Sequence, residues 1–66
     1  MEIHSSAVVS GHAELGEGVK VGPYTMIGEH VTIDAGTEIG AHVVVEGHSR
    51  IGKRNKIYPY TTVGTA

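Results

Sequence analysis

The amino-acid sequence predicts an all-β fold, a parallel β-helix whose coils stack into a triangular prism of hexapeptide repeats. Three observations predict it. An aliphatic residue stands at every sixth position from residue 3 to residue 63, a small or β-branched residue stands two places before almost every one of these, and the residues between them sort into distinct columns when hexads are grouped in threes. Neither a helix nor a plain strand has a period of six, whereas solenoids built from short repeats do.

Each hexad contains one short strand. In an extended chain, residues two apart face the same side, so Val19 and Val21 point inward together and Lys20 points outward. The aliphatic positions expected in the core are Ile3, Val9, Leu15, Val21, Ile27, Ile33, Ile39, Val45, Ile51, Ile57 and Val63. The inward positions two places earlier are small or β-branched except at residue 55, and they are Ala7, Ala13, Val19, Thr25, Val31, Thr37, Val43, Ser49, Asn55 and Thr61.

Each hexad also contains one corner. The residues after each aliphatic position are rich in Gly, Asp, Asn and Pro, and we expect them to turn the chain toward the next face. Glycine directly follows the aliphatic residue at positions 16, 22, 28, 40, 52 and 64, where it would permit backbone angles that other residues resist. The chain is long enough for about three and a third coils.

The outward positions indicate three faces per coil. Grouping by three hexads places residues 8, 26, 44 and 62 in one column, which is apolar or neutral, with Val8, Met26, Val44 and Thr62. The other two columns are polar with mixed charge and contain Glu14, Thr32 and Arg50, and Lys20, Glu38 and Lys56. A wrong grouping would have mixed these columns, so the three-sided coil is favoured.

Length and composition limit the functional classes. The chain has 66 residues, no cysteine and a formal net charge of −2, so we expect one domain, residues 1–66, without disulfides and without a dedicated nucleic-acid surface. No apolar run is long enough to insert into a membrane and no signal peptide opens the chain, so we expect a cytoplasmic protein. Residues 1–46 hold all seven acidic residues and one lysine, while residues 47–66 hold the remaining four of the five basic residues.

Three stretches carry a resemblance to a known family. "IHSSAVV", "VKVGPYTMIG" and "HVVVEGHSRIGKRNKIYPYTTVG" resemble, in order and spacing, the hexapeptide-repeat acyltransferases, and in particular the amino-terminal part of the UDP-N-acetylglucosamine O-acyltransferases of lipid A biosynthesis. Glu46 stands where that family more often has Asn. The resemblance implies a left-handed β-helix and a homotrimer. The usual crossover rule for parallel strands would instead favour a right-handed coil.

The resemblance also implies an activity, which is acyl transfer from acyl carrier protein to the 3-hydroxyl of the sugar nucleotide with a histidine as general base. The catalytic histidine, the nucleotide-binding residues and the helical carboxy-terminal domain of that family lie beyond the part that this chain matches. No catalytic, cofactor-binding or metal-binding residue is therefore assigned, and no cofactor is expected.

Three of the five histidines, His12, His30 and His48, are spaced by 18 residues and are expected to stack at one corner on successive coils. Strand layers about 4.8 Å apart would bring neighbouring imidazoles close together. We expect a solvated or subunit-facing column. A zinc site is the alternative, although such a site in this fold would draw its nitrogens from staggered positions in two subunits.

A second corner column contains Ser6, Tyr24, His42 and Tyr60. Tyrosines in such a column suit a subunit interface, and a stacking surface for a base or sugar is the alternative. The two corner columns flank the apolar face, so the predicted oligomer interface contains Val8, Met26, Val44, Thr62, Tyr24, Tyr60, His12, His30 and His48.

The basic stretch "RIGKRNK" contributes Arg50, Lys53 and Arg54, with Lys56 at its end. It could attract an acidic acyl carrier protein or phosphates, but a solvated set of corner and face residues is the simpler interpretation. Ser5, Ser6 and Ser10 lie near His4 and His12 without a nucleophile motif, so no hydrolase is predicted.

The predicted function is therefore a truncated or engineered amino-terminal module of the acyltransferase, structural and self-associating, without catalysis of its own. We expect a homotrimer that also stacks end to end, because the two ends of the prism would expose strand edges and carry opposite charge. Two alternatives stay open: a fragment that binds the sugar nucleotide or transfers acyl groups through trimer clefts, and a small metal-binding hexapeptide protein.

Overall fold

The computed structural model describes residues 1–64, which form eleven short strands and no helix. Each strand coincides with one hexad of the sequence. The strands are β1 Glu2–Ile3, β2 Val8–Val9, β3 Glu14–Leu15, β4 Lys20–Val21, β5 Met26–Ile27, β6 Val31–Ile33, β7 Glu38–Ile39, β8 Val44–Val45, β9 Ser49–Ile51, β10 Lys56–Ile57 and β11 Thr62–Val63.

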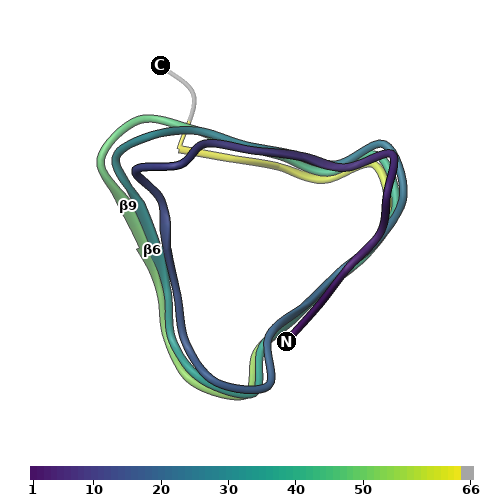
Figure 1. Cartoon of the computed structure of the whole chain (residues 1–66). Coiled ribbons are helices and arrows are strands. Elements are labelled where there is room, and N and C mark those ends of the chain that lie inside the picture. Colours follow the sequence, from purple (N-terminus) through teal and green to yellow (C-terminus); the bar gives the residue numbers. More distant parts are fainter. Residues whose placement is uncertain (65–66) are drawn as a thin grey trace.

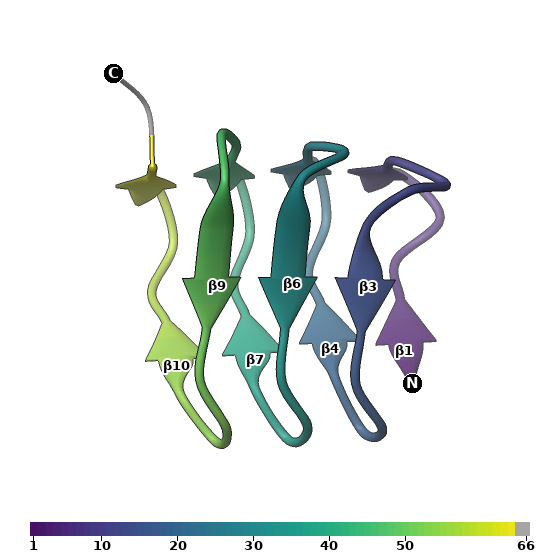
Figure 2. The same cartoon turned by 90° about the vertical axis from the view of Figure 1, so that its left-hand side faces the viewer.

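Every third strand pairs in parallel, which produces three sheets. Sheet A has the order β1-β4-β7-β10, sheet B the order β2-β5-β8-β11, and sheet C the order β3-β6-β9. The sheets form the three sides of a triangle in Figure 1, and Figure 2 shows the coils stacked along the axis with sheet C in front. Paired residues are eighteen apart, as in Glu2 with Lys20, so the predicted three-sided coil is confirmed. The strands fill three coils and two sides of a fourth, which is more than the predicted three and a third coils, because the chain holds eleven strands and each coil takes three.

The coil is left-handed. In Figure 1 the chain runs counterclockwise from its N-terminus, and Figure 2 shows that the successive coils recede from the viewer of Figure 1. The hand that the family resemblance implied is therefore correct. The crossover rule gave the wrong hand because it describes connections that pack back on a twisted sheet, whereas here each connection passes through two other sheets.

The core lies inside the triangle, where both predicted inward sets meet. The buried side chains are Val19, Val21, Ile27, Val31, Ile33, Ile39, Val43, Val45 and Ile51. All of them come from the middle coils. Toward the N-terminal end, the same column opens to solvent, and Ile3 is 43% exposed where Val21 is only 4% exposed.

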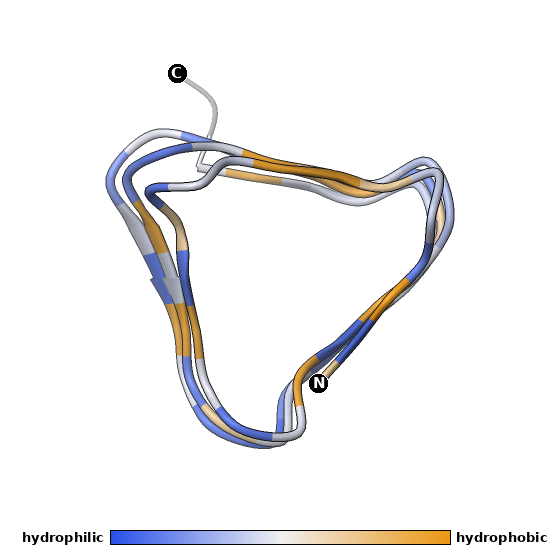
Figure 3. Cartoon of the chain, viewed as in Figure 1, coloured by the Kyte–Doolittle hydropathy of each residue, from blue (hydrophilic) through white to orange (hydrophobic). Residues whose placement is uncertain are grey.

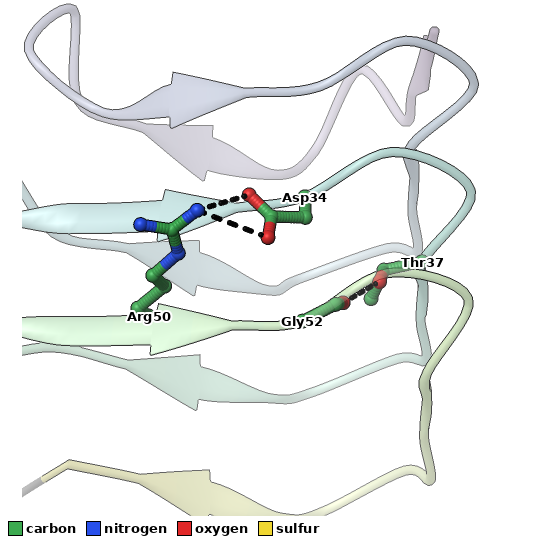
Figure 4. A network of polar contacts seen from close by, with 4 residues as sticks. All are labelled: Asp34, Thr37, Arg50 and Gly52. Atoms are coloured by element: carbon green, nitrogen blue, oxygen red, sulfur yellow. Dashed lines mark hydrogen bonds and ion pairs between the residues drawn. The ribbon is translucent and has the colours of Figure 1, made fainter.

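Two threonines are the buried polar residues of the core, and both are satisfied. Thr25 Oγ1 donates to the carbonyl oxygen of Gly40 at 2.6 Å, and Thr37 Oγ1 donates in the same way to Gly52 at 2.6 Å (Figure 4). Each hydroxyl oxygen also accepts a backbone N–H from the next coil. These bonds remove the cost of burying a hydroxyl and tie one corner to the coil above it.

The glycines play two roles. The expected role, a backbone angle that other residues resist, belongs mainly to glycines that do not directly follow an aliphatic residue. Positive φ angles occur at Gly18, Gly36 and Gly47, and of the glycines that follow an aliphatic residue only Gly64 has one. Glycine is required at position 22 for another reason: a Cβ atom there would lie 2.7 Å from the carbonyl carbon of Gly40 in the next coil. Close stacking of coils, not an unusual backbone angle, accounts for glycine at position 22.

Candidate functional site

The outer face of sheet B is the apolar surface of the molecule. The strand register places Val8, Met26, Val44 and Thr62 in one column. Val8 is 61% exposed and Met26 54% exposed. In Figure 3 the side of the triangle formed by sheet B is apolar along its strands, whereas the other two sides alternate between apolar and polar residues. A column of exposed apolar side chains marks an association surface.

One edge of this face is bounded by an aromatic ladder, formed by Tyr24, His42 and Tyr60. The ring centroids of Tyr24 and His42 are 5.1 Å apart at an interplanar angle of 20°, and those of His42 and Tyr60 are 5.1 Å apart at 4°. All three residues have φ angles between 55° and 63°, in the left-handed region that non-glycine residues rarely adopt. The predicted column is therefore a stacked array.

Backbone geometry holds the ladder in place. The N–H of His42 donates to the carbonyl of Pro23 at 2.9 Å, and the N–H of Tyr60 donates to the carbonyl of Ala41 at 3.1 Å. Ser6 continues the column in the first coil, where its Oγ accepts the N–H of Tyr24 at 3.0 Å. Each corner is thus hydrogen-bonded to the corner of the preceding coil, so the three rings are arrayed one above another along the axis of the β-helix.

The other edge carries the histidine column. His30 stacks on His48 with centroids 4.3 Å apart, and Nε2 of His30 lies 3.5 Å from a carboxylate oxygen of Glu29. His12 occupies the same corner of the first coil and is exposed. Within residues 1–64 no three His, Cys, Asp or Glu side chains are grouped so that they could hold a metal ion.

The basic residues of the last coil are distributed over two sides of the prism and the corner between them. Arg50 projects from sheet C and its Nη2 lies 3.3 Å and 3.5 Å from the two carboxylate oxygens of Asp34 (Figure 4). Lys56 projects from sheet A, with its ammonium 5.7 Å from the ring centre of Tyr58. Lys53 and Arg54 occupy the corner between these sheets. This is the solvated arrangement that the sequence favoured.

His4 and Ser6 make a local contact without an acid partner. Nδ1 of His4 lies 2.7 Å from Ser6 Oγ and also accepts the backbone N–H of Ser6 at 3.1 Å. Within residues 1–64 the ion pairs of histidine are confined to His30. The geometry is that of a tight turn and supplies no oriented base for a nucleophile.

Sequence reasoning missed a hollow on the outer face of sheet A. It has a volume of about 650 Å³, and its lining includes Gly22 and Gly40, with His4 and Tyr58 at its two ends. The sequence has glycine at positions 22 and 40 in the column between His4 and Tyr58, so this part of the face lacks side chains.

Within the described part of the chain no helix is long and apolar enough to cross a membrane.

Comparison with known proteins agrees with this geometry. The sequence profile of the family described as bacterial transferase hexapeptide (six repeats) matches residues 12–47. The acyl-(acyl-carrier-protein)–UDP-N-acetylglucosamine O-acyltransferase of Sulfurovum sp. (strain NBC37-1) is 60% identical over 63 residues, which cover 96% of this chain and 24% of that protein. The enzyme of the same name from Thermodesulfovibrio yellowstonii is 44% identical, with the same coverage.

Solved structures agree as well. A crystal structure of UDP-N-acetylglucosamine acyltransferase superposes with a TM-score of 0.96 at 34% identity and covers 98% of this chain and 25% of its own. LpxA from Acinetobacter baumannii superposes with a TM-score of 0.91 at 47% identity and covers 94% of this chain and 24% of its own. The chain spans about a quarter of the length of these relatives, and the match lies in their amino-terminal part. The repeat, the left-handed coil and these matches together show that the chain belongs to the bacterial transferase hexapeptide family.

Proposed function

We propose that this chain is an amino-terminal β-helical module of an acyl-acyl-carrier-protein:UDP-N-acetylglucosamine O-acyltransferase, and that its role is structural and self-associating. The observation that carries the proposal is the outer face of sheet B, where Val8 and Met26 are exposed between the aromatic ladder and the histidine column. The proposed assembly is a homotrimer in which each subunit covers this face with its neighbours. Acyl carrier protein would be a partner of the complete enzyme.

The module would act as a rigid base for the longer chains of the relatives. A stacked solenoid transmits its orientation from coil to coil, because each strand is hydrogen-bonded to the strand eighteen residues earlier. Residues that take part in acyl transfer must be held within a fraction of an ångström. A scaffold that assembles by its own side chains contributes this precision without touching the substrate.

The apolar face explains why association would use sheet B. Exposed apolar surface contributes about 25 cal/mol per Å² when it is buried, and the aromatic ladder adds flat rings at the rim. The molecule measures 27 × 21 × 19 Å, so one face is small compared with the roughly 800 Å² that each partner buries in a stable interface. A closed ring of three compensates for the small area of one face, because every subunit makes two contacts. End-to-end stacking stays a prediction.

Sedimentation equilibrium of the unmodified chain and of Met26→Glu tests the proposal. We expect at least a trimer mass for the unmodified chain and loss of the trimer for the variant, because the charge would be buried between subunits. Thr32→Glu is the matched control, since Thr32 occupies the equivalent outward position on sheet C. A circular-dichroism spectrum shows whether each variant is folded. Equal masses for the folded unmodified chain and Met26→Glu would refute the interface.

A further inference from the structure

The outer face of sheet A carries charges of alternating sign. Strand pairing aligns Glu2 with Lys20, Lys20 with Glu38, and Glu38 with Lys56, and all four side chains are exposed. Within residues 1–64 the close ion pairs are Arg50 with Asp34 and His30 with Glu29, so none of these four charges has a close ionic partner among the described residues. The column is ordered and available to another molecule.

A second column runs beside the charges and contains His4, Gly22, Gly40 and Tyr58. Ladder hydrogen bonds place it, since His4 N–H donates to the carbonyl of Val21 at 3.0 Å and Gly22 N–H donates to that of Ile39 at 2.8 Å. Both glycines are among the residues that line the 650 Å³ hollow, and Tyr58, which is 66% exposed, lines it as well. The column therefore lacks side chains at its centre and has a ring at each end.

We propose that this face binds an antiparallel copy of itself. The order of the charges along the axis is acid, base, acid, base, and its reverse is base, acid, base, acid. A copy turned by two-fold symmetry would therefore place Glu2 against the partner's Lys56 and Lys20 against the partner's Glu38, and the symmetry repeats both pairs. Such a self-complementary patch is what a two-fold interface requires.

The second column is compatible with the same arrangement. It places His4 next to the partner's Tyr58 at both ends, and Gly22 next to the partner's Gly40 in the middle, where no side chains oppose the approach. The molecule already stacks histidine against tyrosine at the corner, where His42 and Tyr60 have centroids 5.1 Å apart. An antiparallel copy shifted by one coil would bring glutamate against glutamate and lysine against lysine, so the charges select the register.

The interaction is expected to be weak and salt-sensitive, because the face is one side of a molecule 27 Å in its longest dimension. Sheet A and sheet B are different sides of the triangle, so this contact leaves the outer face of sheet B free. It would join assemblies that the sheet B face has already formed. The two proposals therefore fail independently.

Two charge swaps with the same composition test the inference. Lys20→Glu combined with Glu38→Lys changes the column to acid, acid, base, base, which remains complementary to its own reverse. Glu38→Lys combined with Lys56→Glu changes it to acid, base, base, acid, which places like charges together at every contact. Both double variants keep the net charge of −2. We measure the rise of weight-average mass with concentration by sedimentation equilibrium.

We expect the first double variant to associate within about threefold of the unmodified chain and the second to associate at least about tenfold more weakly. A loss of stability does not explain why the second variant associates more weakly. Within the chain, the first variant creates two pairs of like-charged neighbours on adjacent strands, and the second creates only one. If the second variant does not fold, Glu2→Lys with Lys20→Glu has the same symmetry defect. Equal association of the folded variants would overturn the proposal.

Cross-linking separates this face from end-to-end stacking. Chains labelled with heavy and light nitrogen are mixed and treated with a carbodiimide, which joins lysine to a carboxylate in direct contact. Face pairing predicts Lys20–Glu38 links between a heavy and a light chain, and raising the salt to about 0.5 M should remove them. Links between heavy and light chains that join only Glu2 to Lys56, or no such links, would contradict it.

Discussion

The hydroxyl of Thr25 donates a 2.6 Å hydrogen bond to the carbonyl oxygen of Gly40, fifteen residues later in the next coil. The same hydroxyl accepts the N–H of Val43 at 3.2 Å, and the side chain of Thr25 is completely buried. One hydroxyl group therefore satisfies two backbone groups that the corner would otherwise leave unpaired inside the protein.

Thr25→Val should destabilise the fold by about 1 to 3 kcal/mol, because valine keeps the shape but leaves the carbonyl of Gly40 and the N–H of Val43 without partners. Equilibrium unfolding in urea measures the change. Thr62→Val, on the exposed side of sheet B, is the control and should change the free energy of unfolding by less than about 0.5 kcal/mol. Similar values for the two variants would show that the buried hydrogen bonds contribute little.

Gly22→Ala should be among the most damaging small changes in the chain. The added methyl group would lie 2.7 Å from the carbonyl carbon of Gly40, so two coils must separate to accept it. We expect a loss of about 1 to 3 kcal/mol. Gly11→Ala is the matched control, because a methyl group there meets nothing within 4 Å, and thermal unfolding compares the two variants. A melting temperature for Gly22→Ala at or above that of Gly11→Ala would contradict the close approach of the coils.

Arg54→Gly should stabilise the protein. Arg54 has a φ of 54°, its side chain is exposed, and its N–H donates to the carbonyl of Ala35 at 3.0 Å, a bond that glycine keeps. Removing the Cβ atom relieves a left-handed conformation that costs about 1 kcal/mol in other residues. Lys53→Gly, at the neighbouring exposed position without a positive φ, should be neutral or destabilising. Urea unfolding of both variants decides the sign.

Arg50→Ala should have little effect on stability despite its contact with Asp34. The Arg50 side chain is 75% exposed, and exposed ion pairs contribute about 0 to 1 kcal/mol. We expect a loss of less than about 0.5 kcal/mol in 0.15 M salt and a smaller one at higher salt. A loss above about 1 kcal/mol that persists at high salt would show that the pair is structural, in conflict with this expectation.

The period of six predicted the strands and the core because both depend only on which side of an extended chain a residue faces. The three columns required a second observation, the sorting of the outward residues when hexads are grouped in threes. The roles of the glycines were not predictable in the same way. Whether Gly22 is needed for its φ angle or for the space above it depends on the distance between coils, which a single hexad does not contain. The coil's hand came from the family resemblance, and the crossover rule would have misassigned it.

Some features of the candidate surfaces were predicted from the sequence, and others required the structure. The column of Tyr24, His42 and Tyr60 was predicted from their spacing, because residues eighteen apart lie above one another in a three-sided coil. The stacking of the three rings is a finding of the structure. The hollow over Gly22 and Gly40 was missed, since attention to side chains overlooks a column that lacks them. The separation of Arg50, Lys53 and Lys56 onto different sides also required the corner geometry.

The pairing of residues eighteen apart has a consequence for how such proteins change over time. Insertion or deletion of six residues would leave every aliphatic side chain facing the interior, yet it would rotate all later coils by one third of a turn about the axis. A gene could thereby redirect a whole surface toward a new neighbour without altering one amino acid in that surface.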